Sequence, residues 1–180
     1  MTDAAPSLAQ LTAPGDVTAE QHSALTACWV EVTNAGGAAG FPFPPVEAAD
    51  VVPSLDAIIQ NLDPQTSRLL IAEHDGQLAG WLNLRRDQWP LISHWGTIHH
   101  LQARPILQGR GPGTALMTEA RRVARDEMDL EQLHLAAGGG AGLEAFYASL
   151  GWKELGRWPD ALRLAGGDDR DEVLMLLAPL

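Results

Sequence analysis

The sequence is poor in cations, in cysteine and in long apolar stretches. Lysine and arginine number 12 against 23 aspartates and glutamates, so the formal net charge is −11. Binding to nucleic acid without sequence preference needs a basic surface, and we do not expect that class of function. The single cysteine, Cys28, cannot form an internal disulfide. No apolar run reaches the roughly 18 residues of a membrane span, so no membrane partner is expected.

The first residues also lack the elements of a secretory signal. Residues 1–17 contain no lysine or arginine and no continuous apolar core. We therefore expect a cytoplasmic protein whose first 17 residues are partly irregular, with a short strand near Ala9–Leu11 at most. The chain has 180 residues, 46% of them hydrophobic. That is enough for one domain over 1–180 with a substantial core.

The spacing of apolar residues predicts a mixed α/β (α+β) fold. Thr18 and Gln21 form a capping-box pattern ahead of apolar residues that recur at helical spacing. Asp75-Gly76 predicts a tight hairpin turn, and the polar stretch 168–172 predicts a loop between the last two strands. Helices are predicted at 18–33, 53–62, 113–126 and 143–150. Strands are predicted at 68–73, 78–84, 96–103, 133–136, 152–158 and 173–177.

A glycine-rich loop lies between a predicted strand and a predicted helix, over residues 108–114 (QGRGPGT). Glycines let a backbone approach a ligand closely, and the free amides of the next helix carry partial positive charge. Such a loop is suited to a diphosphate. A Walker loop would need Gly-Lys-Ser/Thr, and the G-x-G-x-x-G dinucleotide pattern fails at Thr114 and at Leu116. The pattern that fits is Q/R-x-x-G-x-G/A, over residues 108–113.

Two motifs together resemble one enzyme family. The 108–113 pattern is similar to the pyrophosphate loop of the GCN5-related N-acetyltransferases (GNAT). Residues 146–152 (FYASLGW) resemble that family's F-Y-x-x-x-G-F ending, and the resemblance covers about 68–180. The chain looks most like the tabtoxin-resistance acetyltransferases, through residues 36–41, 133–135 and 144–147. The resemblance implies the GNAT fold, a twisted mixed sheet of about six to seven strands flanked by about four helices.

The resemblance also implies acetyl-CoA as co-substrate and no metal. Pantetheine and the thioester carbonyl are then expected at the backbone of Leu101, Gln102 and Ala103. Phe146 is expected to pack beside the cofactor. The pyrophosphate is expected at Gln108, Gly109, Arg110, Gly111, Gly113 and Thr114. The histidines at 94, 99 and 100 are predicted to lie on both faces of a strand without an acidic ligand, which argues against a metal site.

Acetyl transfer to an amine needs a proton acceptor for the amine and a donor for the departing thiolate. Tyr147, the only tyrosine, occupies the family's tyrosine position and is the candidate acid; the alternative is a core residue. His99 is the candidate base because it titrates in a useful range. In the alternative, His99 only forms structural hydrogen bonds and a chain of water molecules carries the proton. The tabtoxin-resistance relatives have Asp where this chain has Ala136, and many family members have Asn at Gly140.

The acceptor is expected to be a primary amine of a small molecule, cationic or zwitterionic. Phe41, Phe43 and Trp95 are candidate substrate-binding residues because aromatic side chains can wall a pocket. Three alternatives stay open: acetylation of a protein or peptide amine, an acyl-CoA-binding sensor without catalysis, and an interaction protein that binds no nucleotide. The oligomeric state also stays open, and a homodimer is one alternative.

Overall fold

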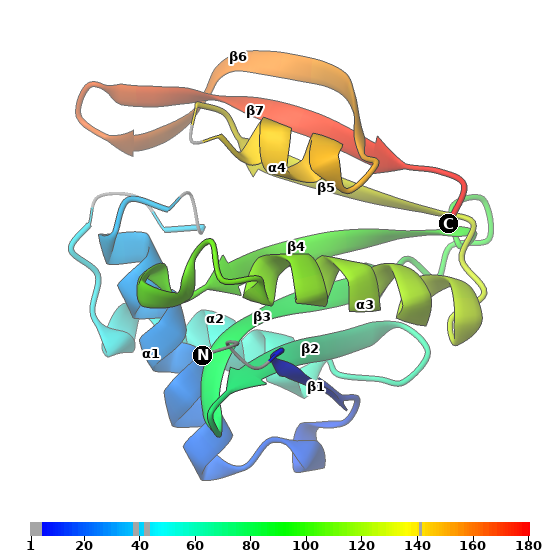
Figure 1. Cartoon of the computed structure of the whole chain (residues 1–180), viewed down its shortest axis with the longest axis horizontal. Helices are drawn as coiled ribbons and strands as arrows, with labels where there is room; N and C mark the ends of the chain where they lie inside the picture. The colour runs from blue at the N-terminus through cyan, green and yellow to red at the C-terminus, as the bar shows by residue number, and fades with distance from the viewer. Residues whose placement is uncertain (1–4, 38–39, 42–43, 141) are drawn as a thin grey trace.

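The computed structural model describes residues 5–37, 40–41, 44–140 and 142–180. These residues form four α-helices and one seven-stranded sheet (Figure 1), which confirms the predicted α+β class. The strands are β1 (Ser7–Leu11), β2 (Ser67–His74), β3 (Gln77–Arg86), β4 (Trp95–Ala103), β5 (Gln132–Gly138), β6 (Lys153–Ala165) and β7 (Asp168–Leu177). The helices are α1 (Ala19–Asn34), α2 (Ala48–Gln60), α3 (Pro112–Asp126) and α4 (Leu143–Ser149). None of the helices in the described ranges is long and apolar enough to cross a membrane.

The strand order is β1-β2-β3-β4-β5-β7-β6, and every neighbouring pair is antiparallel except β4 and β5. The turn between β2 and β3 uses Asp75 and Gly76, both with positive φ, at 50° and 73°. Two successive positive φ angles give the tight turn that the Asp-Gly dipeptide predicted. In Figure 1, β4 and β5 run close together at one end and separate toward the other.

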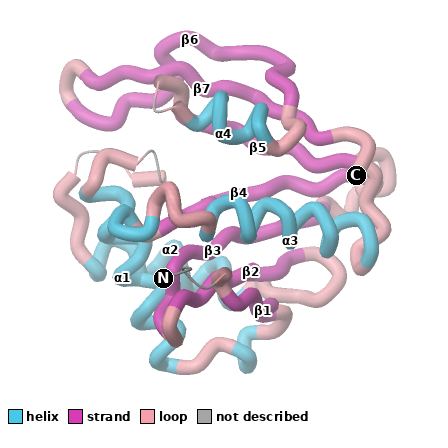
Figure 2. Tube along the Cα trace, in the orientation of Figure 1, coloured by secondary structure: helices cyan, strands magenta, loops and turns pink. Residues whose placement is uncertain are grey.

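Two helices cover each face of the sheet (Figure 2). Helices α1 and α2 lie on one face, where Trp29, Leu55 and Trp81 belong to one buried cluster. Helices α3 and α4 lie on the other face, where Leu116 and Tyr147 belong to a second cluster. Helix α1 packs on β3 and β4, whereas α4 packs on β5 and β6. We call the two sides the α1 face and the α3 face.

Helix α1 begins at the predicted position. The Thr18 hydroxyl accepts a hydrogen bond from the Gln21 amide at 3.1 Å, and the Gln21 side chain accepts one from the Thr18 amide at 3.0 Å. This capping box satisfies donors that a first helical turn leaves open. Further along the helix, Trp29 packs edge-on against Trp81 of β3, with ring centroids 5.1 Å apart. The packing anchors α1 over β3.

Helix α2 begins earlier than predicted. The pattern predicted a helix over 53–62, and the structure has Ala48–Gln60. Asp50 stabilises the first turn by accepting a hydrogen bond from the Glu47 amide at 2.8 Å, and Val51 is fully buried. Burial of Val51 extends the helix upstream, so Pro53 lies inside it. A proline there removes one helical hydrogen bond, and tertiary packing compensates for the loss.

The final hairpin is longer than predicted. Residues 168–172 were predicted to be a loop, and they are the first half of β7. The turn lies instead at Gly166 and Gly167, where Gly167 has a φ of 84°. Arg163 of β6 pairs with Asp169 of β7 at 2.6 Å across the hairpin. Charged residues are compatible with a strand here because the hairpin projects beyond the covering helices (Figure 1).

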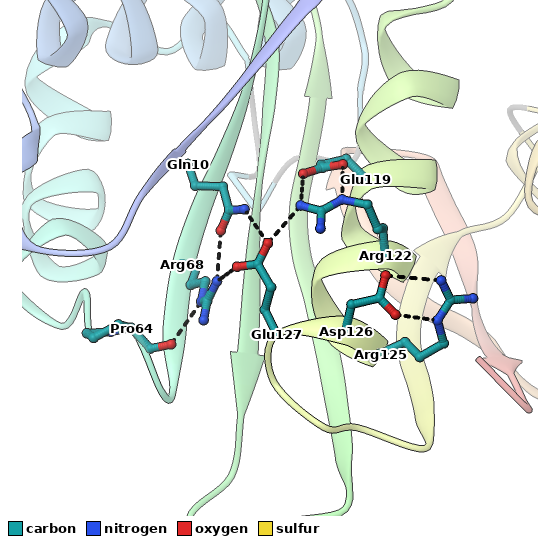
Figure 3. A network of polar contacts seen from close by, with 8 residues as sticks. All are labelled: Gln10, Pro64, Arg68, Glu119, Arg122, Arg125, Asp126 and Glu127. Atoms are coloured by element: carbon teal, nitrogen blue, oxygen red, sulfur yellow. Dashed lines mark hydrogen bonds and ion pairs between the residues drawn. The ribbon is translucent and has the colours of Figure 1, made fainter.

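A polar network ties the end of α3 to β1 and β2 (Figure 3). The guanidinium of Arg68, a residue only 7% exposed, donates to Gln10 and to the Pro64 carbonyl, each at 2.8 Å, and to Glu127. Arg122 of α3 also donates to Glu127, at 2.7 Å. Because Glu127 accepts from two arginines on different elements, it holds α3 in place along the sheet. The glycine-rich loop at the other end of α3 is thereby also positioned.

Replacing Glu127 with alanine removes the charged partner of the buried Arg68. A hydrogen bond to a charged group contributes about 1.5–3 kcal/mol, and solvent access reduces the effect. We expect the free energy of unfolding, measured by urea denaturation, to fall by about 1–2 kcal/mol. Asp126→Ala removes the exposed partner of Arg125 one residue earlier and is the matched control, with a smaller loss expected. Equal losses in the two variants would contradict the role given to Glu127.

Candidate functional site

Strands β4 and β5 leave part of their facing edges unpaired. Their parallel pairing comprises Trp95–Gln132, Gly96–Leu133 and Thr97–His134, and no further pair is formed within the described strands. Strand β4 nevertheless continues to Ala103, and β5 continues to Gly138. We call residues 98–103 and 135–138 the unpaired edges. Backbone groups on such edges can bond to an extended ligand as to an added strand.

A β-bulge lies in the unpaired edge of β4. Asn83 of β3 opposes His99, and Trp81 opposes Gln102, so Leu82 alone faces two residues of β4. His100 takes a positive φ of 56° at this point. An extra residue on one strand breaks the alternation of side chains between the two faces. The predicted placement of His99 and His100 on opposite faces of the strand is therefore wrong.

Both histidines of the bulge lie on the α1 face. The His100 ring packs on Trp29 with centroids 4.8 Å apart, and the His99 ring is 6.0 Å from the His100 ring. Leu101 instead packs against the cluster on the α3 face. The Oε1 atom of the fully buried Gln102 has no hydrogen-bond partner among the described residues, and neither does the Nε1 atom of Trp81. Buried polar atoms without partners are rare and mark this part of the sheet as unusual.

Both imidazoles are neutral at neutral pH. Burial lowers the pKa of His99 to about 4, with further contributions from the positive charge of Arg85 and from His100. Burial and Arg85 also lower the pKa of His100. A neutral imidazole has a free lone pair and can accept a proton. The bulge therefore presents two proton acceptors on the α1 face.

The glycine-rich loop presents free backbone donors. Gly109 and Gly111 have positive φ angles, 78° and 98°, which glycine adopts without strain. Within the described residues, the amides of Gly109, Gly111, Gly113 and Thr114 donate no hydrogen bond. Gly111 is the N-cap of α3, so these amides gather at the positive end of a helix. Such an arrangement suits a phosphate group.

The loop contacts helix α4 directly. A Cβ atom added at Gly113 would lie 3.4 Å from Cζ of Phe146. The next residue, Tyr147, packs against Phe146 with ring centroids 5.1 Å apart. This contact explains in physical terms why the loop motif and the Phe-Tyr motif occur together. It also brings Tyr147 into the neighbourhood of the loop.

Tyr147 is protonated at neutral pH. Burial raises the pKa of its hydroxyl to about 12. The residue is only 6% exposed, and its hydroxyl forms no hydrogen bond within the described ranges. The hydroxyl is nevertheless not among the fully enclosed polar atoms that lack a partner. It can therefore donate a hydrogen bond to a ligand that reaches α4.

Of the candidate substrate-binding residues that the structure describes, it places Phe41 near the bulge and Trp95 away from it. Phe41 packs on Trp29, with centroids 5.1 Å apart, and so lies in the aromatic group that includes His100. Phe43 lies outside the described residues. Trp95 stands at the paired end of β4 and stacks on His134, with centroids 4.4 Å apart. The structure therefore places Trp95 away from the bulge, at the end of β4 where the strands are still joined.

Sequence reasoning missed three residues near the bulge. Trp29 and Arg85 were not singled out, and His100 was placed on the opposite strand face from His99. Arg85 follows directly after the predicted strand 78–84 and precedes a second arginine, Arg86, so no signal in the sequence set it apart. The position of His100 depends on a bulge, which leaves no clear mark in the spacing of apolar residues.

A model of the acetyltransferase (GNAT) family matches residues 19–152. The chain belongs to this family. The match spans the free amides of the loop, the bulge and Tyr147. The finer resemblance to tabtoxin-resistance acetyltransferases stays a prediction.

A curated relative is a mycothiol acetyltransferase of Nocardia farcinica (strain IFM 10152), 39% identical over 67 residues. The aligned region is 37% of this GNAT chain and 21% of that protein, so the chain spans about a fifth of the relative's length.

Solved structures of GNAT proteins share the fold at low sequence identity. A putative phosphinothricin N-acetyltransferase has a TM-score of 0.75 at 18% identity, covering 96% of this chain and 98% of that chain. A ribosomal-protein-alanine N-acetyltransferase from Brucella melitensis has a TM-score of 0.73 at 19% identity, with coverages of 96% and 99%. A putative acetyltransferase from Salmonella typhimurium, solved with acetyl-CoA, has a TM-score of 0.72 at 16% identity, with coverages of 97% and 94%.

The buried, neutral histidines of the bulge predict a loss of stability in mild acid. The unfolded chain takes up protons near pH 6.5, while folding lowers the pKa of His99 to about 4. Hence the free energy of unfolding falls as the pH drops from 6.5 toward 4, by about 1–2 kcal/mol after solvent screening. Urea denaturation at several pH values measures this. His99→Gln should show a shallower fall than the wild type.

His94→Gln, at an exposed histidine just before β4, controls for the replacement of a histidine by glutamine. If His99→Gln and His94→Gln follow the same pH dependence, the neutral state assigned to His99 is wrong.

Proposed function

We propose that this GNAT protein is an acetyl-CoA-dependent N-acetyltransferase that moves an acetyl group to a primary amine of a small molecule. The observation that carries the proposal is the combination of free amides at the start of α3 with the unpaired edges of β4 and β5. The first suits the diphosphate of a CoA ester, and the second suits its extended pantetheine arm. Family membership supports the same reaction class.

The loop holds the charged half of the co-substrate. The amides of Gly109, Gly111, Gly113 and Thr114 donate to the diphosphate oxygens, helped by the dipole of α3. The Arg110 side chain is exposed and has no ion-pair or hydrogen-bond partner in the described part of the chain. It is therefore available as a counter-charge. Gln108 holds the loop toward β4, because its side chain donates to the Ala103 carbonyl at 3.3 Å.

The edge of β4 orients the pantetheine arm and the thioester. Residues 101–103 pair with β3 on one side only, so the backbone groups on their other side, apart from the Ala103 carbonyl that accepts from Gln108, are available to the ligand. A bound acetyl-CoA supplies the thioester that the amine attacks. Amide donors near the thioester carbonyl stabilise the charge that develops on its oxygen. Phe146, packed against Gly113, closes the site beside the loop.

His99 accepts the proton of the attacking amine. A free alkylamine has a pKa near 10.4, so most of it is protonated at neutral pH and cannot attack. His99 is a weak base, because burial and Arg85 lower its pKa to about 4. Transfer from a free ammonium to such a base is uphill, directly or through water, so His99 accepts the proton only as the amine nitrogen bonds to the thioester carbon and its N–H becomes more acidic. Ala136, at the position of the relatives' Asp, brings no carboxylate to this route.

Tyr147 stabilises the departing thiolate. A thiol has a pKa near 8.5. Burial raises the pKa of Tyr147 to about 12. Complete proton transfer from Tyr147 to sulfur is therefore uphill, and the hydroxyl acts as a hydrogen-bond donor to the developing charge. The hydroxyl has no hydrogen-bond partner in the described ranges, which leaves the donor free for this role.

The amine enters from the α1 face. His99, His100 and Phe41 lie on that face, opposite α3. A shallow groove between the end of α1 and the β6–β7 hairpin is lined by Gly36, Phe41, Leu164 and Asp168, among others. Arg170 of the hairpin donates to the Gly36 carbonyl at 3.4 Å, which brings the two segments together. Phe41 remains the candidate substrate-binding residue that this geometry supports best.

Gly109→Ala tests the amide cradle. Alanine strains a φ of 78° and puts a methyl group where the backbone must approach a phosphate. We expect the Kd for acetyl-CoA, measured by calorimetry, to rise at least about tenfold, which corresponds to roughly 1.4 kcal/mol. Gly76→Ala is the control, because Gly76 has a similar φ of 73° in the β2–β3 turn and equally open surroundings. If Gly109→Ala binds acetyl-CoA as the wild type does, the cradle is wrongly assigned.

Tyr147→Phe tests catalysis separately from binding. The variant keeps the ring packing and loses the hydroxyl, so we expect an unchanged Kd for acetyl-CoA and a kcat lowered about 10²-fold. The assay follows CoA release in the presence of a panel of amines. Amine-dependent release by the wild type distinguishes a transferase from an acyl-CoA sensor. Full turnover in Tyr147→Phe would remove Tyr147 from the mechanism.

A further inference from the structure

Arg85 lies on the α1 face beside the bulge. In the sheet register it opposes Thr97 of β4, and its strand neighbour Asn83 opposes His99. Side chains two apart on a strand share a face, so Arg85 stands on the same face as Asn83 and His99. The side chain is exposed, while Asn83 beneath it is buried. Arg85 is therefore open to solvent on the side from which the amine enters.

Arg85 has no hydrogen-bond or ion-pair partner among the described residues, which is unusual for an arginine of this chain. The 12 cations are Lys153 and 11 arginines, set against 23 acidic residues. Nine arginines donate a hydrogen bond to a carboxylate or a carbonyl, namely Arg68, Arg86, Arg104, Arg121, Arg122, Arg125, Arg157, Arg163 and Arg170. Arg85 and Arg110 form no such bond in the described part of the chain.

The two arginines without partners belong to the two ends of the proposed site. Arg110 is in the glycine-rich loop, where a diphosphate supplies the negative charge. Arg85 is on the opposite face of the sheet from α3, because its neighbour Leu84 packs in the cluster beneath that helix. A CoA ester held at the start of α3 has its phosphates on that other side. The anion that Arg85 is free to bind therefore belongs to the second substrate.

The positive charge of Arg85 acts on the histidines at the proposed reaction centre. It contributes to the lowered pKa of both His99 and His100. A charge that acts on both imidazoles is within interaction range of an amine placed beside His99. The chain as a whole carries a net charge of −11 and repels anions. Binding an anionic acceptor therefore requires a local positive group such as Arg85.

We propose that Arg85 binds a carboxylate of the amine acceptor, so that the acceptor is an amino acid or a similar amine with an anionic group. The guanidinium fork matches the two oxygens of a carboxylate and fixes the amine relative to His99. The inference rests on the proposed function and narrows its substrate from amines in general to zwitterionic ones. It also assigns recognition of the acceptor's carboxylate to Arg85 and acceptance of the amine's proton to His99 in the bulge.

Matched amine pairs test the substrate class. Each pair is an amino acid and its primary carboxamide, and kcat/KM is expressed per concentration of neutral amine to remove differences in amine pKa. The wild type should prefer the carboxylate at least about tenfold, the lower end expected for a charge-assisted hydrogen bond. Acetylation without such a preference would overturn this inference and leave the transferase standing. Absence of turnover with every amine would overturn the proposed function itself.

Arg85→Gln tests the residue. For the amino acid, KM should rise about 10- to 100-fold with a smaller change in kcat, while the carboxamide and the Kd for acetyl-CoA change little. Arg85→Lys keeps the positive charge without the planar guanidinium group, so its KM for the amino acid should lie between those of the wild type and Arg85→Gln. Arg125→Gln, near the far end of α3, is the control for removing one positive charge. If Arg85→Gln slows the amino acid and the carboxamide equally, Arg85 does not bind the carboxylate.

Discussion

The ending of strand pairing after Thr97 and His134 is the constraint on which the site depends. Up to that point β4 and β5 form an ordinary parallel ladder. Beyond it each strand remains bonded to its outer neighbour, β3 or β7, so the sheet stays intact while the two inner edges are left open. An open edge inside a sheet, unlike one at its border, is flanked by rigid structure on both sides. It can therefore bind an extended ligand without a change of fold.

The elements around these edges place different functional groups on the two faces of the sheet. On the α3 face, free amides and Arg110 are the groups proposed to bind a diphosphate, and the contact between Gly113 and Phe146 brings Tyr147 into the same neighbourhood. On the α1 face, His100 of the bulge packs on Trp29, His99 lies beside His100, and Arg85 is exposed. Two substrates can then approach from opposite sides and meet at the unpaired edge of β4. Direct transfer between them needs no covalent enzyme intermediate.

The parts of the site that are local in sequence were predictable. The glycine-rich loop and the Phe-Tyr motif each fit within seven residues, and their chemistry follows from backbone freedom and ring packing. Strand and helix positions also followed from apolar spacing, apart from the start of α2 and the length of the last hairpin. Those two depend on burial of Val51 and on ion pairs across β6 and β7, which only the folded chain shows. The bulge and the unpaired Arg85 depend on the register between strands and could not be read from spacing.

Backbone amide hydrogen exchange with and without acetyl-CoA, followed residue by residue by NMR, tests the central claim most directly. We expect new protection at Gly109, Gly111, Gly113 and Thr114, whose amides have no partner among the described residues, and along residues 101–103 of β4. Amides in the β2–β3 turn serve as an internal reference and should not change. Saturable binding of acetyl-CoA that leaves the loop and the unpaired edge of β4 unprotected would contradict the account.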